Sequence, residues 1–226
     1  MFLEAVHFRP SGEGEAGFAN RLLAVGVNAQ GFRETLGIRE ETDQGEDSWG
    51  VFLGELQKRG LTGVKLFVSS WSPPLRQAIA EVYPGAKYQN SVQQAGQKVL
   101  ALVPNEQLPA VTEMMGSFAR ISDGRDSARG QVRQIIARLD QLELEDAAAL
   151  LREMSAVLFN YYLFPPEHWR CLRTNEGLLH IARKVRERAR VLGIAPDGKR
   201  ATLMLGGYLR HIARSNWDRS RYLPVT

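Results

Sequence analysis

The segment that decides the fold reads "VKLFVSSWSPPLRQAIAEVYPG" and covers residues 64–85. An apolar run at 64–68 is followed by a serine-rich cluster, two prolines and then apolar residues at helical spacing. This order predicts a buried strand, a tight loop and a helix. Because α/β folds place their chemistry at the carboxyl ends of such strands, the loop with Ser69 and Ser70 is the first candidate site.

The segments around it complete a sheet. Three strands are expected at 2–8, 18–27 and 34–39, and the short polar turns between them indicate an antiparallel arrangement. A helix is expected at about 48–60, and "AKYQN" at 86–90 predicts a short fifth strand. The order βββαβαβ therefore predicts an α/β fold with a mixed sheet and helices on its faces.

From about residue 92 the strand signals disappear and helical patterns replace them. Helices are expected at about 92–102, 106–120, 125–141 and 144–162, the last ended by Pro165 and Pro166. We interpret this block as a helical insertion packed on the sheet domain.

The last part of the chain predicts two further helices. "FPPEHWR" is interpreted as a rigid, packed turn, which leads into a helix at 176–192 and a final amphipathic helix from about 198. The expected division is the first part of the sheet domain at 1–91, the insertion at 92–165, and the final helices with a basic C-terminal part at 166–226.

Bulk composition indicates a folded protein without a membrane span. The chain has 226 residues, of which 44% are hydrophobic and 24% are charged, and no apolar run approaches the roughly 20 residues of a membrane helix. The N-terminus contains Glu4 and no basic region, so it does not predict a secretory signal. The single cysteine, Cys171, excludes an internal disulfide and favours a reducing, cytoplasmic location.

Charge is unevenly distributed. The net charge is +4, yet the residues from Arg173 onward hold twelve Lys and Arg against four Asp and Glu, which leaves the first 172 residues at −4. A basic C-terminal quarter predicts an anionic partner, and nucleic acid is the commonest one.

The helix at 176–192 concentrates that charge. Residues 183–190 of this helix contain five Lys and Arg, and only one acid, Glu187, lies between these cations. The cations form either a solvated helix face or a surface that binds nucleic-acid phosphates. The expected DNA contacts are Arg183, Lys184, Arg186, Arg188 and Arg190, supported by Lys199, Arg200, Arg210 and Arg214.

Motifs for other chemistries do not occur. The four histidines and Cys171 lack zinc-ligand spacing, so no metal site is expected from them. The sequence contains no phosphate-binding glycine loop with its lysine, and "VSSWS" is not a serine nucleophile elbow.

Several separated motifs resemble the catalytic domain of Mutator-type bacterial insertion-sequence transposases. They are "LLAVGVNAQGFRETLGI", "GVKLFVSS", "AIAEVYPGAKYQ", "FPPEHWRCLRT" and "VRERARVLG", and the resemblance runs from about Met1 to Tyr208. It implies a ribonuclease-H-like fold interrupted by a helical insertion. In that family a sizeable DNA-binding region precedes the first strand, so the sequence-specific reader of transposon ends is expected to be absent here.

The resemblance also implies which residues would form the active site. Family members use Asp, Asp and Glu to hold two divalent ions, and the matching positions here are Glu4, Ser70 and Leu179. A family Cys-x-x-His motif corresponds to Ser91 and Gln94. The catalytic triad is therefore expected to be degenerate.

Three functional hypotheses follow. The first is a transposase-derived DNA-binding protein that is catalytically inactive, needs no cofactor, and binds DNA mostly without sequence preference or binds a protein, as a homodimer or a mixed dimer with an active relative. The second is an active metal-dependent transposase or nuclease with a rebuilt Mg²⁺ site that uses Glu4 and Glu176 or another acid. The third is a protein-interaction scaffold that does not bind DNA.

Overall fold

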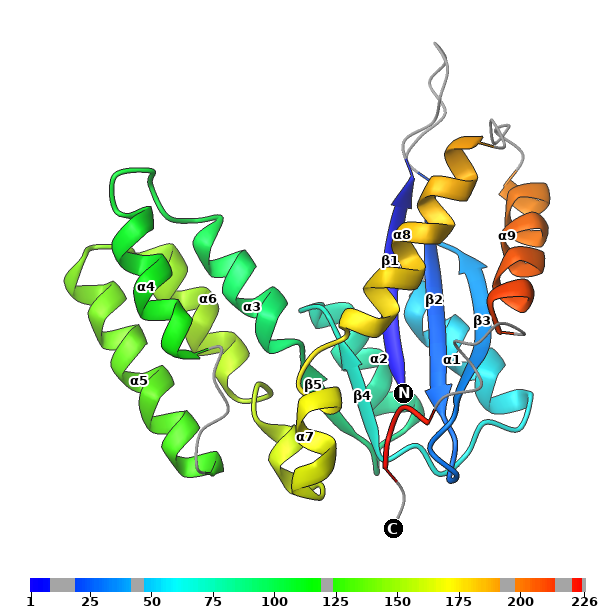
Figure 1. Cartoon of the computed structure of the whole chain (residues 1–226), viewed down its shortest axis with the longest axis horizontal. Helices are drawn as coiled ribbons and strands as arrows, with labels where there is room; N and C mark the ends of the chain where they lie inside the picture. Colours follow the sequence, from blue (N-terminus) through cyan, green and yellow to red (C-terminus); the bar gives the residue numbers. More distant parts are fainter. Residues whose placement is uncertain (9–18, 42–46, 119–123, 192–197, 214–220, 225–226) are drawn as a thin grey trace. The chain divides into compact units, whose positions relative to one another are not determined.

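The computed structural model describes residues 1–8, 19–41, 47–118, 124–191, 198–213 and 221–224 (Figure 1). Its described part contains one five-stranded mixed sheet with the strand order β3-β2-β1-β4-β5. The strands are β1 (Phe2–Phe8), β2 (Ala19–Val27), β3 (Arg33–Glu40), β4 (Leu66–Ser69) and β5 (Lys87–Asn90). Strands β1, β2 and β3 pair in antiparallel fashion, as their short connections predict. This order confirms the expected α/β class and its ribonuclease-H-like arrangement.

The helices follow the expected sequence. They are α1 (Ser48–Lys58), α2 (Pro73–Val82), α3 (Val92–Leu100), α4 (Leu108–Phe118), α5 (Arg125–Gln141), α6 (Glu145–Ser155), the 3-10 turn η1 (Asn160–Leu163), α7 (Pro166–Leu172), α8 (Glu176–Val191) and α9 (Gly198–Ala213). The start of helix α2 is fixed by local sequence. The Ser72 hydroxyl caps the helix by accepting a hydrogen bond from the Leu75 amide at 3.3 Å. A serine cap followed by prolines in the first turn is typical of a helix start.

The chain divides into two compact units. The first unit comprises Met1–Phe67, Ser72–Lys87 and Asn175–Thr226, and the second comprises Val68–Trp71 and Tyr88–Thr174.

In the first unit, helices cover both faces of the antiparallel strands. Glu4, Leu23 and Ile38 are register partners across β1, β2 and β3, so their side chains lie on one face. Helix α8 packs against β1, and α9 packs against β3, where a methyl group on Gly206 would lie 3.8 Å from Ile38. Both helices therefore cover this face. Gly37 of β3 faces the opposite side of the sheet. A methyl group placed on Gly37 would lie 3.4 Å from the Phe52 ring, so helix α1 covers that side.

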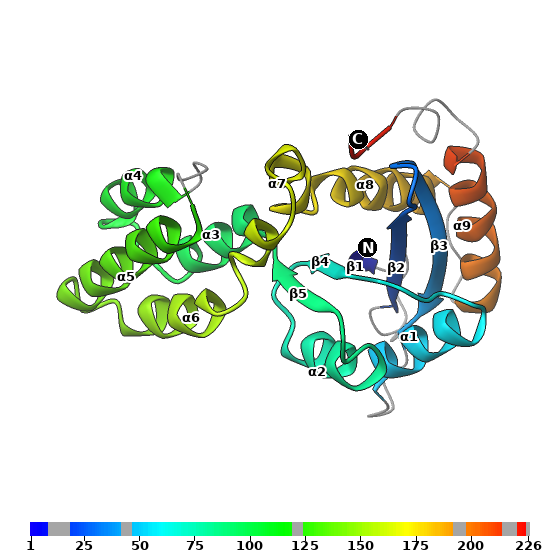
Figure 2. The same ribbon diagram turned by 90° about the horizontal axis from the view of Figure 1, so that it is seen from below.

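In the second unit, helices α3 to α6 pack around an apolar core (Figure 2). Fully buried side chains from these helices include Val99, Val111, Leu139 and Leu151. Burial of each such side chain contributes about 1.5–3 kcal/mol relative to exposure, so this core stabilises a bundle of its own.

The predicted helix at 144–162 is wrong in its second half, since α6 ends at Ser155. The backbone beyond it is used by β5 instead. Gln89 donates to the Leu158 carbonyl at 2.7 Å and accepts from the Tyr161 amide at 2.9 Å, while the Asn90 amide donates to the Val157 carbonyl at 3.0 Å. If the helix continued, these backbone groups would form hydrogen bonds within the helix and could not bond to β5.

The packed turn predicted for "FPPEHWR" is also wrong, because Pro166 is the first residue of helix α7. Proline at the first helical position loses no hydrogen bond, since that amide has no partner inside a helix. The Trp169 indole donates to the Phe164 carbonyl at 2.7 Å and closes this short helix onto the chain before it.

Candidate functional site

Glu4 projects from β1 toward the start of helix α8. Its Oε2 accepts a hydrogen bond from Nδ2 of Asn175, and the two atoms are 2.6 Å apart. Asn175 is completely buried, whereas Glu4 is half-buried. Because an ionised carboxylate can only accept, the amide of Asn175 must present its nitrogen to Glu4. The pair is therefore a charge-assisted hydrogen bond.

Asn175 also directly precedes helix α8. Its backbone carbonyl accepts from the amides of Leu178 at 2.9 Å and Leu179 at 3.0 Å. The backbone of Asn175 thus bonds to the first turn of α8, and its side chain bonds to Glu4 on the central strand β1. The sequence reasoning missed Asn175, although an asparagine directly before a helical run is a recognisable cap signal.

Two positions on α8, Leu179 and Glu176, offer less to a metal ion. Leu179 lies in the first turn of α8 and is half-buried, and its side chain contains no oxygen, nitrogen or sulfur. Glu176, the first residue of α8, is exposed. Asn175, and not Glu176, donates the 2.6 Å hydrogen bond to Glu4.

Ser70 follows β4 and belongs to the second unit. Its hydroxyl donates to Oε1 of Gln94 on α3. The carbonyl of Ser70 accepts from the Tyr88 hydroxyl at 2.8 Å and from the Ser69 hydroxyl at 2.7 Å, and these two hydroxyl oxygens are 2.9 Å apart. The end of β4 is therefore a network of neutral hydroxyl and amide groups.

That network unites two motifs that the resemblance treats separately. The family resemblance implies that Ser70 stands at the position of the second acid and Gln94 at that of the histidine in the Cys-x-x-His motif. Ser91, which matches the cysteine, is completely buried, and its hydroxyl has no hydrogen-bond partner among the described residues. Throughout the described ranges, no three His, Cys, Asp or Glu side chains gather into a set that could hold a metal ion.

Helix α8 presents cations to solvent. Leu178, Ile181 and Val185 are buried, whereas Arg183, Lys184 and Arg188 are exposed and Arg186 is half-buried. Ion pairs between described residues include Arg21–Glu40, Arg39–Glu55, Arg129–Asp126 and Arg152–Asp140. None of these pairs involves the described α8 cations Arg183, Lys184, Arg186 and Arg188. The exposed charges of α8 are therefore open to an anionic partner.

Helix α9 supports this surface in part. The Arg188 guanidinium lies 6.0 Å from the centre of the Tyr208 ring, and Arg210 is exposed. The side chains of the predicted contacts Arg190, Lys199 and Arg200 lie outside the described residues, as does the whole of Arg214.

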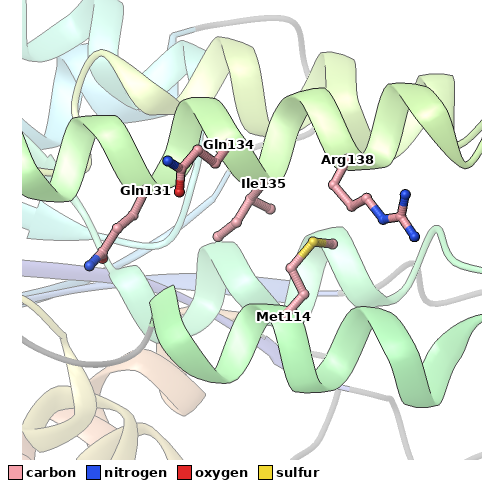
Figure 3. Close-up of a pocket in the computed structure, with 5 residues that line it drawn as sticks. All are labelled: Met114, Gln131, Gln134, Ile135 and Arg138. Atoms are coloured by element: carbon pink, nitrogen blue, oxygen red, sulfur yellow. The ribbon is translucent and has the colours of Figure 1, made fainter.

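A separate open hollow lies in the second unit between α4 and α5. Figure 3 shows Met114 projecting from α4 toward Ile135 of α5, with Gln131, Gln134 and Arg138 along the same helix. None of the predicted site residues lines it. In the chain as far as it is described, no helix has the length and apolar character that crossing a bilayer requires.

Comparison with known proteins agrees with the motifs. Residues 2–220 match the family described as "Transposase, Mutator family". The transposase for insertion sequence element IS1081 of Mycobacterium tuberculosis (strain ATCC 25618 / H37Rv) is 30% identical over 205 residues, which cover 90% of this chain and 49% of that protein. The transposase for IS406 of Burkholderia multivorans is 29% identical over 87% of this chain and 50% of its own length.

The transposase for IS256 in transposon Tn4001 of Staphylococcus aureus is 24% identical over 83% of this chain and 48% of its own length. The chain thus spans about half the length of these relatives. The family predicted from the motifs is confirmed over nearly the whole sequence. The chain belongs to the Mutator family of transposases.

Proposed function

We propose that this chain is a Mutator-family domain that binds DNA and does not carry out strand transfer. The observation that carries the proposal is the surface of α8, where Arg183, Lys184 and Arg188 are exposed on the helix that buries Leu178, Ile181 and Val185. A helix with cations on its open side suits the phosphate backbone of a duplex, which is recognised without regard to sequence.

Loss of catalysis is proposed from the chemistry of the three matched positions. Two-ion strand transfer requires several hard oxygen ligands around paired divalent ions. Glu4 supplies one carboxylate, which already accepts from Asn175; Ser70 supplies a hydroxyl, which donates to Gln94; and Leu179 supplies no ligand atom. These residues do not fit two magnesium ions, so the proposed function contains no metal-dependent step.

The test is a titration of labelled duplex DNA at low and moderate salt, with and without Mg²⁺, followed by a gel of the DNA. We expect binding that weakens as salt rises and DNA that stays intact. With three phosphates neutralised, the logarithm of the affinity should fall with a slope of about −2.7 against the logarithm of salt concentration.

Two triple variants with the same change in net charge test whether DNA affinity depends on the α8 surface or only on total charge. The triple variant Arg183→Gln, Lys184→Gln, Arg188→Gln should lose most of the affinity. The control Lys58→Gln, Arg76→Gln, Lys98→Gln removes the same charge from exposed positions on α1, α2 and α3 and should keep it. Equal losses in both triples would overturn the assignment to α8.

The other outcomes separate the rival functions. Mg²⁺-dependent nicks that disappear in Glu4→Gln would overturn the loss of catalysis and favour an enzyme with a rebuilt site. Absence of binding even at low salt would overturn DNA binding and favour a scaffold for a protein partner.

A further inference from the structure

Residues 221–224 return to the sheet of the first unit. The amides of Tyr222 and Leu223 both donate to the Gly31 carbonyl, at 2.8 Å and 3.2 Å. Gly31 lies in the turn between β2 and β3 with φ 84°, a left-handed conformation that favours glycine. The Arg221 guanidinium lies 5.9 Å from the centre of the Phe32 ring in the same turn.

The Tyr222 ring joins three elements. It meets the Phe2 ring of β1 edge to face, with ring centres 5.5 Å apart, and the Arg33 guanidinium of β3 lies 4.9 Å from its centre. On helix α8, a methyl group placed on Gly177 would lie 3.5 Å from the Tyr222 hydroxyl. Gly177 therefore lets the tyrosine lie directly against the helix backbone.

This contact adjoins the Glu4 site. Phe2 and Glu4 are two residues apart on β1, so their side chains share a face of the sheet. Gly177 and Asn175 are likewise two residues apart at the start of α8. The same helix start is thus held on the same face twice, by Tyr222 against Phe2 and by Asn175 against Glu4.

We propose that residues 221–224 form a strap that closes over the start of α8 and holds the Asn175–Glu4 hydrogen bond in place. Tyr222 is its anchor, and the Gly31 carbonyl fixes its backbone. Release of the strap would free the first turn of α8 from β1 and expose the Glu4 carboxylate. The inference does not depend on DNA binding, because Tyr222, Gly177, Asn175, Phe2 and Glu4 carry it and none of them is a proposed DNA contact.

Hydrogen exchange of the full chain tests the strap. In Tyr222→Ala, the amides of Leu178 and Leu179, which bond to Asn175, should exchange at least about tenfold faster, while the amides of α5 keep their rates. The control Ile181→Val removes one buried methylene from α8 without touching the strap and should not single out these two amides.

A second pair of variants leaves Tyr222 intact. Gly177→Ala places its methyl group at an ordinary contact distance and should preserve slow exchange at Leu178 and Leu179. Gly177→Leu needs the space that the Tyr222 ring fills and should reproduce the fast exchange of Tyr222→Ala. Unchanged exchange at these amides in both Tyr222→Ala and Gly177→Leu, or an equal increase throughout the chain, would overturn the proposal.

Discussion

Asn175 and Glu4 are 171 positions apart in the sequence, and their side chains form a 2.6 Å hydrogen bond. The bond ties the first turn of α8 to the central strand β1. It also engages the carboxylate that the family resemblance matches to a catalytic acid. A neutral amide donor at this place stabilises the charge of Glu4 without any ion, which agrees with the proposed loss of catalysis.

Replacing Asn175 should destabilise the fold, and for Asn175→Asp the loss of stability should depend on pH. Asn175→Ala removes a hydrogen bond to a charged group and should lower the free energy of unfolding by about 1.5–3 kcal/mol. Asn175→Asp places two carboxylates together, which raises the pKa of one of them. That variant should therefore be weakest at neutral pH and regain stability as the pH falls, which urea unfolding at several pH values measures. Addition of Glu4→Gln should restore its stability at neutral pH, and failure to do so would contradict direct contact between the two side chains.

A single cation on α8 should have a measurable share in DNA affinity. Arg183→Gln should reduce the salt slope of binding by about 1 and weaken binding to all duplex sequences alike, because a phosphate contact reads no bases. Titrations at four or more salt concentrations with two unrelated duplexes measure both effects. A loss confined to one of the duplexes would show instead that Arg183 contacts bases.

Gln89 should be a sensitive position in the second unit. It is completely buried and bonds to the backbone of Leu158 and Tyr161. Gln89→Ala leaves two buried backbone groups without partners, so the free energy of unfolding should fall by about 3 kcal/mol or more. The exposed Gln97 on α3 supplies the control, since Gln97→Ala should change stability by less than about 0.5 kcal/mol. Denaturant unfolding of both variants tests this, and similar stabilities would contradict the role of Gln89.

Tyr161 should make the protein sensitive to alkali. Burial raises the pKa of its hydroxyl well above the usual value, and the neighbouring Tyr162 raises the pKa further. Above about pH 10 the unfolded chain releases a proton that the folded chain keeps. The free energy of unfolding should therefore fall with rising pH, by about 1.4 kcal/mol per pH unit for this group. Below about pH 10 both states keep the proton and the effect disappears. Tyr161→Phe should flatten the alkaline decline in urea unfolding, and an unchanged decline would assign it to other groups.

The sheet and most helices could be predicted because their signals are local. The apolar run of β1, the short polar turns between the first three strands and the capped start of α2 depend on neighbours within a few residues. The end of α6 could not be predicted in this way. Local propensity favours a helix beyond Ser155, but the side chain of Gln89 on a distant strand takes the backbone groups that such a helix would use.

The candidate site shows the same division. The residue types at Glu4, Ser70 and Leu179 can be read directly from the sequence, together with the cation row on α8 and the family to which the motifs belong. Only the tertiary structure decided that Glu4 bonds to Asn175, that Ser70 bonds to Gln94, and that Tyr222 lies against Gly177. Periodicity reports which face of an element is buried, but partners far apart in the chain meet only once the packed strands and helices have brought them together.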